Sequence, residues 1–130
     1  GVTQDANALG YFGYAYYAEN TARLKAVPVV NPKGKAVSPS MDNVINGSYE
    51  PLSRPVFIYV SKASAQRAEV REFVEFYLSK GALLVEEVKY VPLSKNSYEH
   101  ALRNFRAGKA GTAFGGKNEI GLTVEELLAR

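Results

Sequence analysis

The sequence predicts an α/β fold in which a buried central strand is covered by helices. Residues 56–60 (VFIYV) are an unbroken run of β-branched and aromatic residues, and Pro55 stands at the first position, where a strand needs no backbone donor. Amphipathic helical patterns follow this run, and a shorter one precedes it. A run that is apolar at every position suits a strand buried on both faces. We therefore expect Ser53–Val60 to be the strand around which the chain packs.

Two shorter strands and a helix are expected near the start of the chain. The composition of Ala8–Phe12 (ALGYF) indicates a short strand. From Tyr14, apolar residues at helical spacing predict a helix that ends near Leu24. Ala26–Val30 predicts a second strand, and the NPKG sequence that follows it at residues 31–34 is typical of a turn.

A short helix is expected between this turn and the central strand. Ser40 is a favourable N-cap residue, and Gly47 is suited to end the helix. The residues between them that share the apolar side are Met41, Val44 and Ile45.

The clearest helical pattern follows the central strand. Ser64 is a plausible N-cap, and Gly81 is expected at the C-terminal end of the helix. The apolar positions follow the i, i+3, i+4, i+7, i+8 spacing of one helical face and are Val70, Phe73, Val74, Tyr77 and Leu78. Leu84, Val85 and Val88 then predict a second, separate short helix.

The remaining part of the chain predicts one more amphipathic helix and a glycine-rich tail. Residues 90–93 should be extended because Pro92 prevents a helix there. Ser94 should cap a helix whose buried side is Tyr98, Ala101, Leu102 and Phe105. Residues 107–121 contain five glycines, which predicts an irregular, flexible segment. Thr123 and Glu126 form a capping box for a last helix over Val124–Ala129.

Length and composition are typical of one globular domain spanning residues 1–130. The chain is 46% hydrophobic, and its formal net charge of +3 arises from Lys and Arg interspersed with Glu. A nucleic-acid partner is therefore not expected, since that would require basic residues clustered on one face. The absence of cysteine excludes disulfides and thiolate sites. No run approaches the roughly 20 apolar residues needed to cross a bilayer, and no signal peptide is visible. Because the first residue is Gly1, we expect a processed or truncated product.

Four groups of residues are candidates for chemical sites, and a structural explanation is favoured for the first three. Gly111–Lys117 (GTAFGGK) matches the start of a phosphate-binding P-loop, but Asn118 follows where a hydroxyl residue is needed and a helix precedes it instead of a strand. His100 is the only histidine; the chain has no cysteine, and its two aspartates, Asp5 and Asp42, are far away in sequence, so a surface histidine is favoured over a general base. The pair Glu86 and Glu87 could serve as a glycosidase-like or metal site, but adjacent helix residues point in different directions, so a solvated pair is the better explanation.

The fourth group is a weak basic cluster near the C-terminus, for which an anionic partner and simple solvent exposure both remain open. Its members are Arg103, Arg106, Lys109 and Lys117. From the residues alone we expect no catalytic site, no metal site and no cofactor.

Several segments together resemble one known family. After Gly1 and Val2, they are ALGYFGYAYY (8–17), NGSYEPLSRPVFIYV (46–60), FVEFYLSKGALLVEEVKYVPL (73–93) and the TAFGG of the tail. In this order and spacing they resemble the C-terminal part of the phosphate-binding protein of bacterial phosphate ABC importers, the PstS family. The resemblance covers essentially the whole chain.

The resemblance implies the C-terminal portion of a type II periplasmic-binding-protein-like fold, with a sheet flanked by helices that is incomplete without an N-terminal half. Such proteins are not enzymes: they bind inorganic phosphate between two lobes and deliver it to a membrane permease. The resemblance also implies a periplasmic or cell-surface location. Residues 8–12 would lie near a crossing between the lobes.

The phosphate ligands of the family lie in segments that would precede Gly1, so no ligand residue is assigned in this chain. Arg54 in particular does not match the arginine of the family. Unpaired strand edges could drive the chain to form a homodimer. The alternative to a phosphate-transport role is a stand-alone interaction or assembly domain derived from the same fold.

Overall fold

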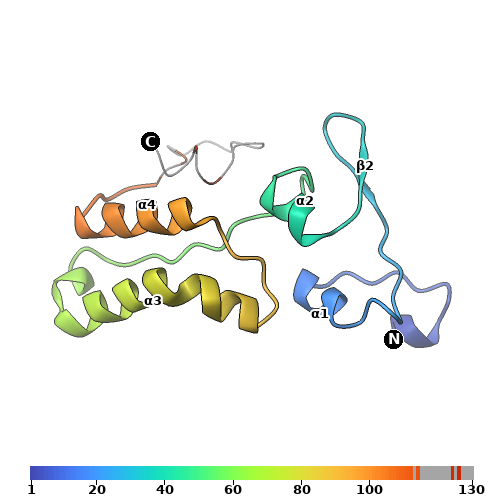
Figure 1. The fold of residues 1–130 in the computed structure, drawn as a ribbon, viewed down its shortest axis with the longest axis horizontal. Coiled ribbons are helices and arrows are strands. Elements are labelled where there is room, and N and C mark those ends of the chain that lie inside the picture. Colours follow the sequence, from blue (N-terminus) through green and yellow to red (C-terminus); the bar gives the residue numbers. More distant parts are fainter. Residues whose placement is uncertain (113, 115–123, 125, 127–130) are drawn as a thin grey trace.

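A pair of long helices lies at one end of the molecule, and short elements gather at the other (Figure 1). The computed structural model describes residues 1–112, 114, 124 and 126. Its elements in chain order are the 3-10 turn η1 (Val2–Gln4), α1 (Tyr14–Ala18), β1 (Val29–Val30), β2 (Ala36–Val37), α2 (Met41–Ile45), the 3-10 turn η2 (Ser64–Gln66), α3 (Ala68–Glu87) and α4 (Lys95–Arg106). No described helix is both long and apolar enough to span a membrane.

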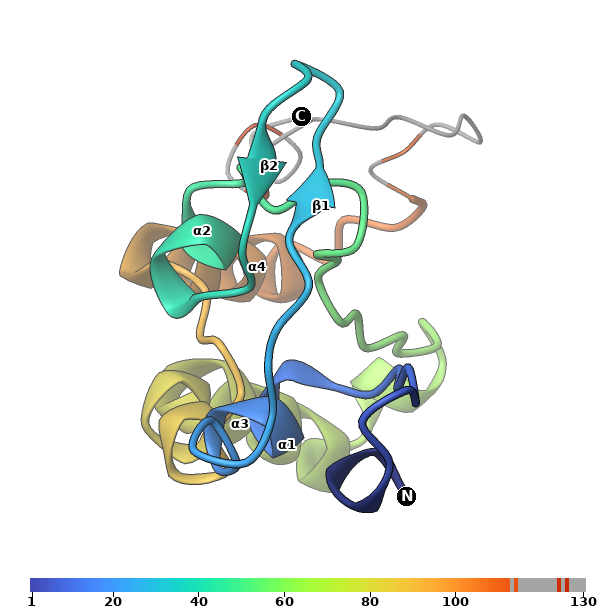
Figure 2. The same cartoon turned by 90° about the vertical axis from the view of Figure 1, so that its right-hand side faces the viewer.

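The hairpin β1–β2 is the sheet formed by the described residues, and it projects beyond α2 (Figure 2). Its antiparallel register pairs Val29 with Val37 and Val30 with Ala36. The predicted turn at 31–34 is confirmed, because the buried Asn31 side chain accepts the backbone N–H groups of Lys33 and Lys35 at 3.0 and 3.1 Å. The predicted strand Ala26–Val30 is shorter than expected, and the sequence pattern did not indicate β2.

The predicted helix capped by Ser40 is confirmed as α2. The Ser40 hydroxyl accepts the backbone N–H of Asn43 at 3.1 Å, which satisfies one donor of the first turn. Gly47 follows the helix with a φ of +74°, a conformation that favours glycine. The helix predicted from Tyr14 forms only as α1, which ends at Ala18 and not near Leu24.

The helix α3 differs from its prediction at both ends. Its N-cap position is Arg67, because Ser64 lies in the separate turn η2. The helix also continues through Gly81 to Glu87, so the two predicted helices are one. Gly81 lies where α3 packs against α4. A Cβ atom at this position would be 3.2 Å from Cε1 of Tyr98, so glycine allows α4 to approach closely.

The helix α4 begins as predicted and packs against α3. The Ser94 hydroxyl accepts the backbone N–H of Ser97 at 3.2 Å, and Ser97 itself is fully buried. The four predicted contact residues of α4 are all half-buried. The last predicted helix, Val124–Ala129, and most of the predicted tail lie outside the described residues, although Val124 and Glu126 are helical.

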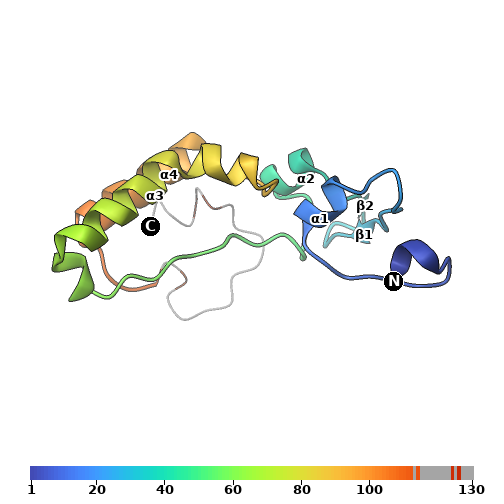
Figure 3. The same cartoon turned by 90° about the horizontal axis from the view of Figure 1, so that it is seen from below.

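The prediction of a central strand at Ser53–Val60 is wrong for this chain. The segment runs alongside the α3–α4 pair without a described strand next to it (Figure 3). The prediction for Ala8–Phe12 is also wrong, since these residues belong to no strand. Both segments have the composition of strands, but a strand forms only where a second strand supplies backbone partners.

Few side chains are fully buried. Within the part of the chain that the structure describes, the buried apolar side chains are Val37 and Val74, which lie in different elements. The contact of α3 with α4 is therefore a small local core, and most large apolar side chains remain partly accessible.

Candidate functional site: an open apolar face

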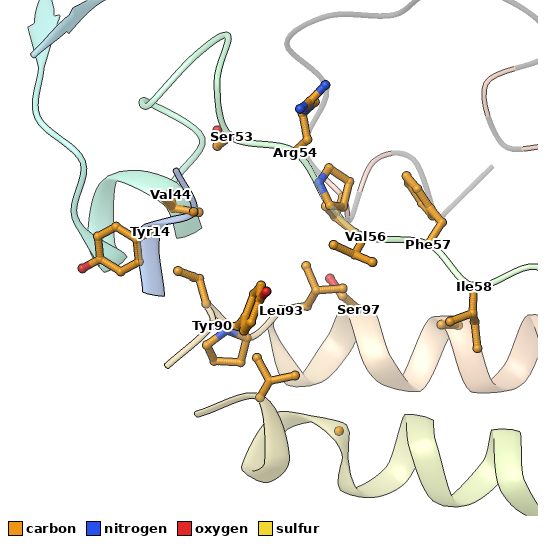
Figure 4. A pocket seen from close by; sticks show the side chains of 18 of the residues that line it. Tyr14, Val44, Ser53, Arg54, Val56, Phe57, Ile58, Tyr90, Leu93 and Ser97 are labelled. Carbon is orange, nitrogen blue, oxygen red and sulfur yellow. The ribbon is translucent and has the colours of Figure 1, made fainter. Parts of the chain in front are cut away.

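An open concave face is lined by the extended segment 53–60 and by the helices beside it (Figure 4). Val56, Phe57 and Ile58 line it from residues 53–60, while Leu93 lines it from just before α4 and Ser97 from the first turn of α4. In Figure 4, Val56 and Ile58 point toward the side of α4, and Phe57 points to the opposite side. The side chains thus alternate as they do in a strand.

The apolar side chains of this segment are exposed. The exposed fraction is 81% for Val56 and 87% for Tyr59, while Phe57 and Ile58 are about half as accessible. Phe57 has one ring contact, an edge-to-face arrangement with Phe114 at 5.6 Å between centroids. Exposed apolar residues are ordinary when they are scattered, but a contiguous patch marks an interaction surface.

The backbone of the same segment has no partner among the described residues. From Arg54 to Val60 no N–H or C=O forms a backbone hydrogen bond, whereas Ser53 donates to Tyr49 just before the segment and Ala65 donates to Ser61 just after it. Buried backbone groups are nearly always paired. The side chains of this segment are those of a buried strand. Its backbone N–H and C=O groups, however, have no hydrogen-bond partner among the described residues.

A second apolar segment lines the same face. Leu9 and Tyr11 are 85% and 83% exposed, and residues 9–12 also lack backbone hydrogen bonds within the described chain. Tyr11 lies close enough to Tyr49 to affect it: burial raises the pKa of Tyr49, and the charge that Tyr11 would carry raises that pKa further. The face thus joins two segments about 45 residues apart in sequence.

Two polar side chains at the start of the extended segment, Ser53 and Arg54, do not converge on one point. The Ser53 hydroxyl donates to the carbonyl of Tyr49 at 2.7 Å. The exposed side chain of Arg54 points away from α4 in Figure 4. Among the residues that the structure describes, no three His, Cys, Asp or Glu side chains are grouped as a metal site would need. The face can therefore bind an apolar, strand-like partner, and Ser53 and Arg54 do not form an anion site on it.

The residues weighed from the sequence are not brought together. His100 is half-buried on α4, and Glu86 and Glu87 are exposed at the end of α3. Of the basic cluster, Arg103 and Lys109 are exposed, while Arg106 forms an ion pair with Glu75. Lys117 and most of the P-loop-like segment Gly111–Lys117 lie outside the described residues.

The ion pair between Arg106 and Glu75 was not predicted. Nε and one terminal nitrogen of Arg106 donate to the two carboxylate oxygens of Glu75 at 2.9 and 3.1 Å, and this links α4 to α3. The hydrogen bond from Arg106 lowers the pKa of the Glu75 carboxyl and raises that of the guanidinium. No local spacing could indicate a pair that joins residues 31 positions apart.

Comparison with known proteins identifies relatives of this chain. No family model matches it. Protein SphX of Synechococcus elongatus is 52% identical over 128 residues, which are 98% of this chain and 38% of that protein. Phosphate-binding protein PstS of Staphylococcus aureus is 36% identical over 107 residues, 82% of this chain and 32% of PstS.

A solved structure supports the same relationship. A protein of Planctomyces limnophilus, described as a possible phosphate binding protein, matches with a TM-score of 0.69 and 45% identity. The match covers 84% of this chain and 39% of that protein. The predicted fold class and family resemblance are thus confirmed, and the chain spans about two-fifths of the length of SphX and of the P. limnophilus protein.

Proposed function

This chain belongs to the PstS family of phosphate-binding proteins, and we propose that it is the C-terminal part of a protein that captures inorganic phosphate and delivers it to the permease of an ABC importer. The observation that carries this proposal is the similarity in both sequence and fold, since the P. limnophilus match combines 45% identity with a TM-score of 0.69. Proteins of this role act at the outer side of a membrane, so the proposed location is periplasmic or cell-surface.

The proposed role is non-catalytic. The relatives with functional names are called binding proteins. On the open apolar face, the Ser53 hydroxyl pairs locally with the carbonyl of Tyr49, and the Arg54 side chain points away from α4. Binding a dehydrated oxyanion requires several N–H and hydroxyl donors directed at one point. We place those donors in the part of the relatives that this chain does not match.

Isothermal titration with phosphate tests this assignment, with sulfate as the control anion and S. aureus PstS as the reference protein. We expect no heat from the 130-residue chain and phosphate-selective heat from PstS. The Arg54→Ala variant should behave as the unchanged chain does. Tight, phosphate-selective binding by the chain alone would overturn the claim that its ligands lie elsewhere.

A second candidate function is a stand-alone interaction or assembly domain derived from this fold. The extent of exposed apolar surface favours it, because Val56 and Tyr59 would be covered in a stable assembly. In that case the chain alone should form a defined homodimer or larger oligomer in solution, which sedimentation analysis would detect. A concentration-independent monomer would argue against it.

A further inference from the structure

Asn46 and Gly47, which follow α2, are the one Asn-Gly pair in the sequence. In such a pair the backbone nitrogen of the glycine can reach the side-chain amide carbon of the asparagine, because glycine has no Cβ to obstruct the approach. Every other asparagine of the chain precedes a residue with a side chain. Asn46 is exposed and Gly47 is half-buried, so water reaches both residues.

The side-chain amide of Asn46 is held in a turn. Its Oδ1 accepts the backbone N–H of Ser48 at 2.9 Å. The φ of +74° at Gly47 permits this tight turn. Attack on Cγ of Asn46 would place negative charge on Oδ1, and a donor already directed at this atom stabilises such charge. The turn therefore favours nucleophilic attack on the Asn46 side chain.

The backbone of the same residues opposes this attack. Asn46 has φ −80° and ψ 1°, and in this conformation the Gly47 nitrogen is turned away from Cγ. The N–H of Gly47 donates to the carbonyl of Val44 at 3.2 Å, and the N–H of Tyr49 donates to the carbonyl of Asn43 at 3.0 Å. Attack thus requires a rotation about the Cα–C bond of Asn46 that breaks the hydrogen bonds at the end of α2.

The helix α2 can open locally. It has 5 residues, all of which remain at least partly accessible to solvent. The hydrogen bond of Gly47 to Val44 is at the long end of the usual range. Short segments with few buried contacts open at a much smaller free-energy cost than the whole chain. The reactive conformation of Asn46 is therefore reached without global unfolding.

We propose that Asn46 is a site of spontaneous deamidation and that local opening of α2 controls its rate. The backbone nitrogen of Gly47 attacks Cγ of Asn46, and the proton of that nitrogen leaves with the side-chain amide as ammonia. The succinimide ring that forms is then opened by water at either carbonyl, which gives aspartate or isoaspartate. Both products carry a carboxylate, so the formal net charge of +3 falls by one unit.

The isoaspartate product would weaken a connection between α2 and the hairpin β1–β2. Ser48 joins the two elements. Its hydroxyl donates to Oδ1 of Asn43 at 3.3 Å, and its carbonyl accepts Nδ2 of the buried Asn31 at 3.4 Å. Isoaspartate adds a carbon to the backbone and moves the carboxylate away from the N–H of Ser48. The modification should therefore loosen the hairpin relative to α2.

Ageing of the 130-residue chain in mildly alkaline buffer, followed by peptide mass mapping and enzymatic labelling of isoaspartate, tests the proposal. We expect Asn46 to be modified first, and at least about 10-fold faster in guanidinium chloride than in buffer, because the folded chain reacts only while α2 is open. Modification of another asparagine before Asn46, or equal rates with and without denaturant, would overturn the proposal.

A pair of glutamine variants identifies the reacting residue. Asn46→Gln should abolish the modification, because the longer side chain would have to close a less favourable ring. Asn7→Gln changes another exposed asparagine, which precedes Ala8, and should leave the modification unchanged. Persistence of the same modified peptide in Asn46→Gln would contradict the assignment.

A matched pair of cap variants tests the control by α2. Ser40→Ala removes the hydroxyl that caps α2, and Ser94→Ala removes the corresponding hydroxyl that caps α4. Loss of an N-cap shifts a helix toward its open state by about 5-fold, so Ser40→Ala should accelerate deamidation in buffer by about that factor. Ser94→Ala should leave the rate unchanged. Equal acceleration by both variants would show that the reaction occurs in the globally unfolded chain and would contradict local control.

Discussion

At the scale of single residues, the position of Lys89 marks where α3 ends. Lys89 follows the helix with a φ of +60°, the left-handed conformation in which glycine is the usual residue. The N–H of Lys89 donates to the carbonyl of Glu86, and the N–H of Tyr90 donates to that of Val85, so the last carbonyls of the helix are satisfied. The helix thus ends with a glycine-type cap made by a lysine, while Gly81 lies within it.

Lys89→Gly should therefore stabilise the chain. Glycine adopts a positive φ without the steric cost that a lysine has there, so we expect the free energy of unfolding to rise by about 0.5–1 kcal/mol. Lys80→Gly is the control, because the same change in the interior of α3 should lower that free energy by about 1 kcal/mol. Urea denaturation followed by circular dichroism measures both, and a loss of stability in Lys89→Gly would contradict the cap.

Gly81→Val should destabilise the contact of α3 with α4. A side chain at this buried position would push the ring of Tyr98 away, and overpacking of this kind costs about 1–3 kcal/mol. Lys80→Val introduces the same residue at an exposed neighbouring position and should cost less than about 0.7 kcal/mol. Equal losses in the two variants would show that the packing against Tyr98 is unimportant.

At the scale of elements, the pair of α3 and α4 is the best-defined unit of the molecule. The two helices approach closely at Gly81, and Ser97 is buried near the start of α4. The pair of Glu75 with Arg106 joins them toward the other end of α4. Both partners are partly exposed, so this ion pair orients the helices more than it stabilises them.

The ion pair of Glu75 with Arg106 predicts how the stability of the folded chain depends on pH. Because the hydrogen bond from Arg106 lowers the pKa of Glu75 in the folded state, its stabilising effect is present above the ordinary glutamate pKa of about 4.3. The effect is lost as the pH falls through the lowered value. Arg106→Ala should raise the pKa of Glu75 toward the ordinary value, which carboxyl NMR titration measures. Arg103→Ala, which removes an exposed arginine from the same helix, should leave that pKa unchanged.

At the scale of the whole molecule, the arrangement is open and extended. The α3–α4 pair and the hairpin region lie at opposite ends, and the unpaired segment 53–60 runs from one to the other (Figure 1). A compact chain of 130 residues has a radius of gyration of about 14 Å. The accessible surface of 9880 Å² for 14.2 kDa exceeds the roughly 6,800 Å² of a compact monomer, so this chain does not reach such compactness.

Small-angle X-ray scattering of the chain alone, extrapolated to zero concentration, should therefore give a radius of gyration clearly above about 14 Å. An apolar dye should bind to the exposed face, and Tyr59→Asp should reduce its binding more than Tyr16→Asp does, because Tyr16 does not line the face. A radius near 14 Å with no dye binding would mean that the apolar face is covered within the chain itself.

Features that depend on neighbouring residues could be predicted from the amino-acid sequence. The turn at 31–34, the capping of α2 by Ser40 and of α4 by Ser94, and the amphipathic pattern of the two long helices rest on local hydrogen bonds and spacing. The family resemblance, which the relatives confirm, rests on segments read in order.

Features that depend on partners distant in sequence could be recognised only in the three-dimensional structure. Gly81 looked like a helix end because glycine weakens helices, but Tyr98 of the facing helix explains its presence. Residues 56–60 have the composition of a buried strand, yet a strand requires hydrogen bonds from other strands, and the described chain supplies none to them. The open apolar face exists for the same reason: composition fixes which residues favour burial, and only the fold decides whether a partner is there to bury them.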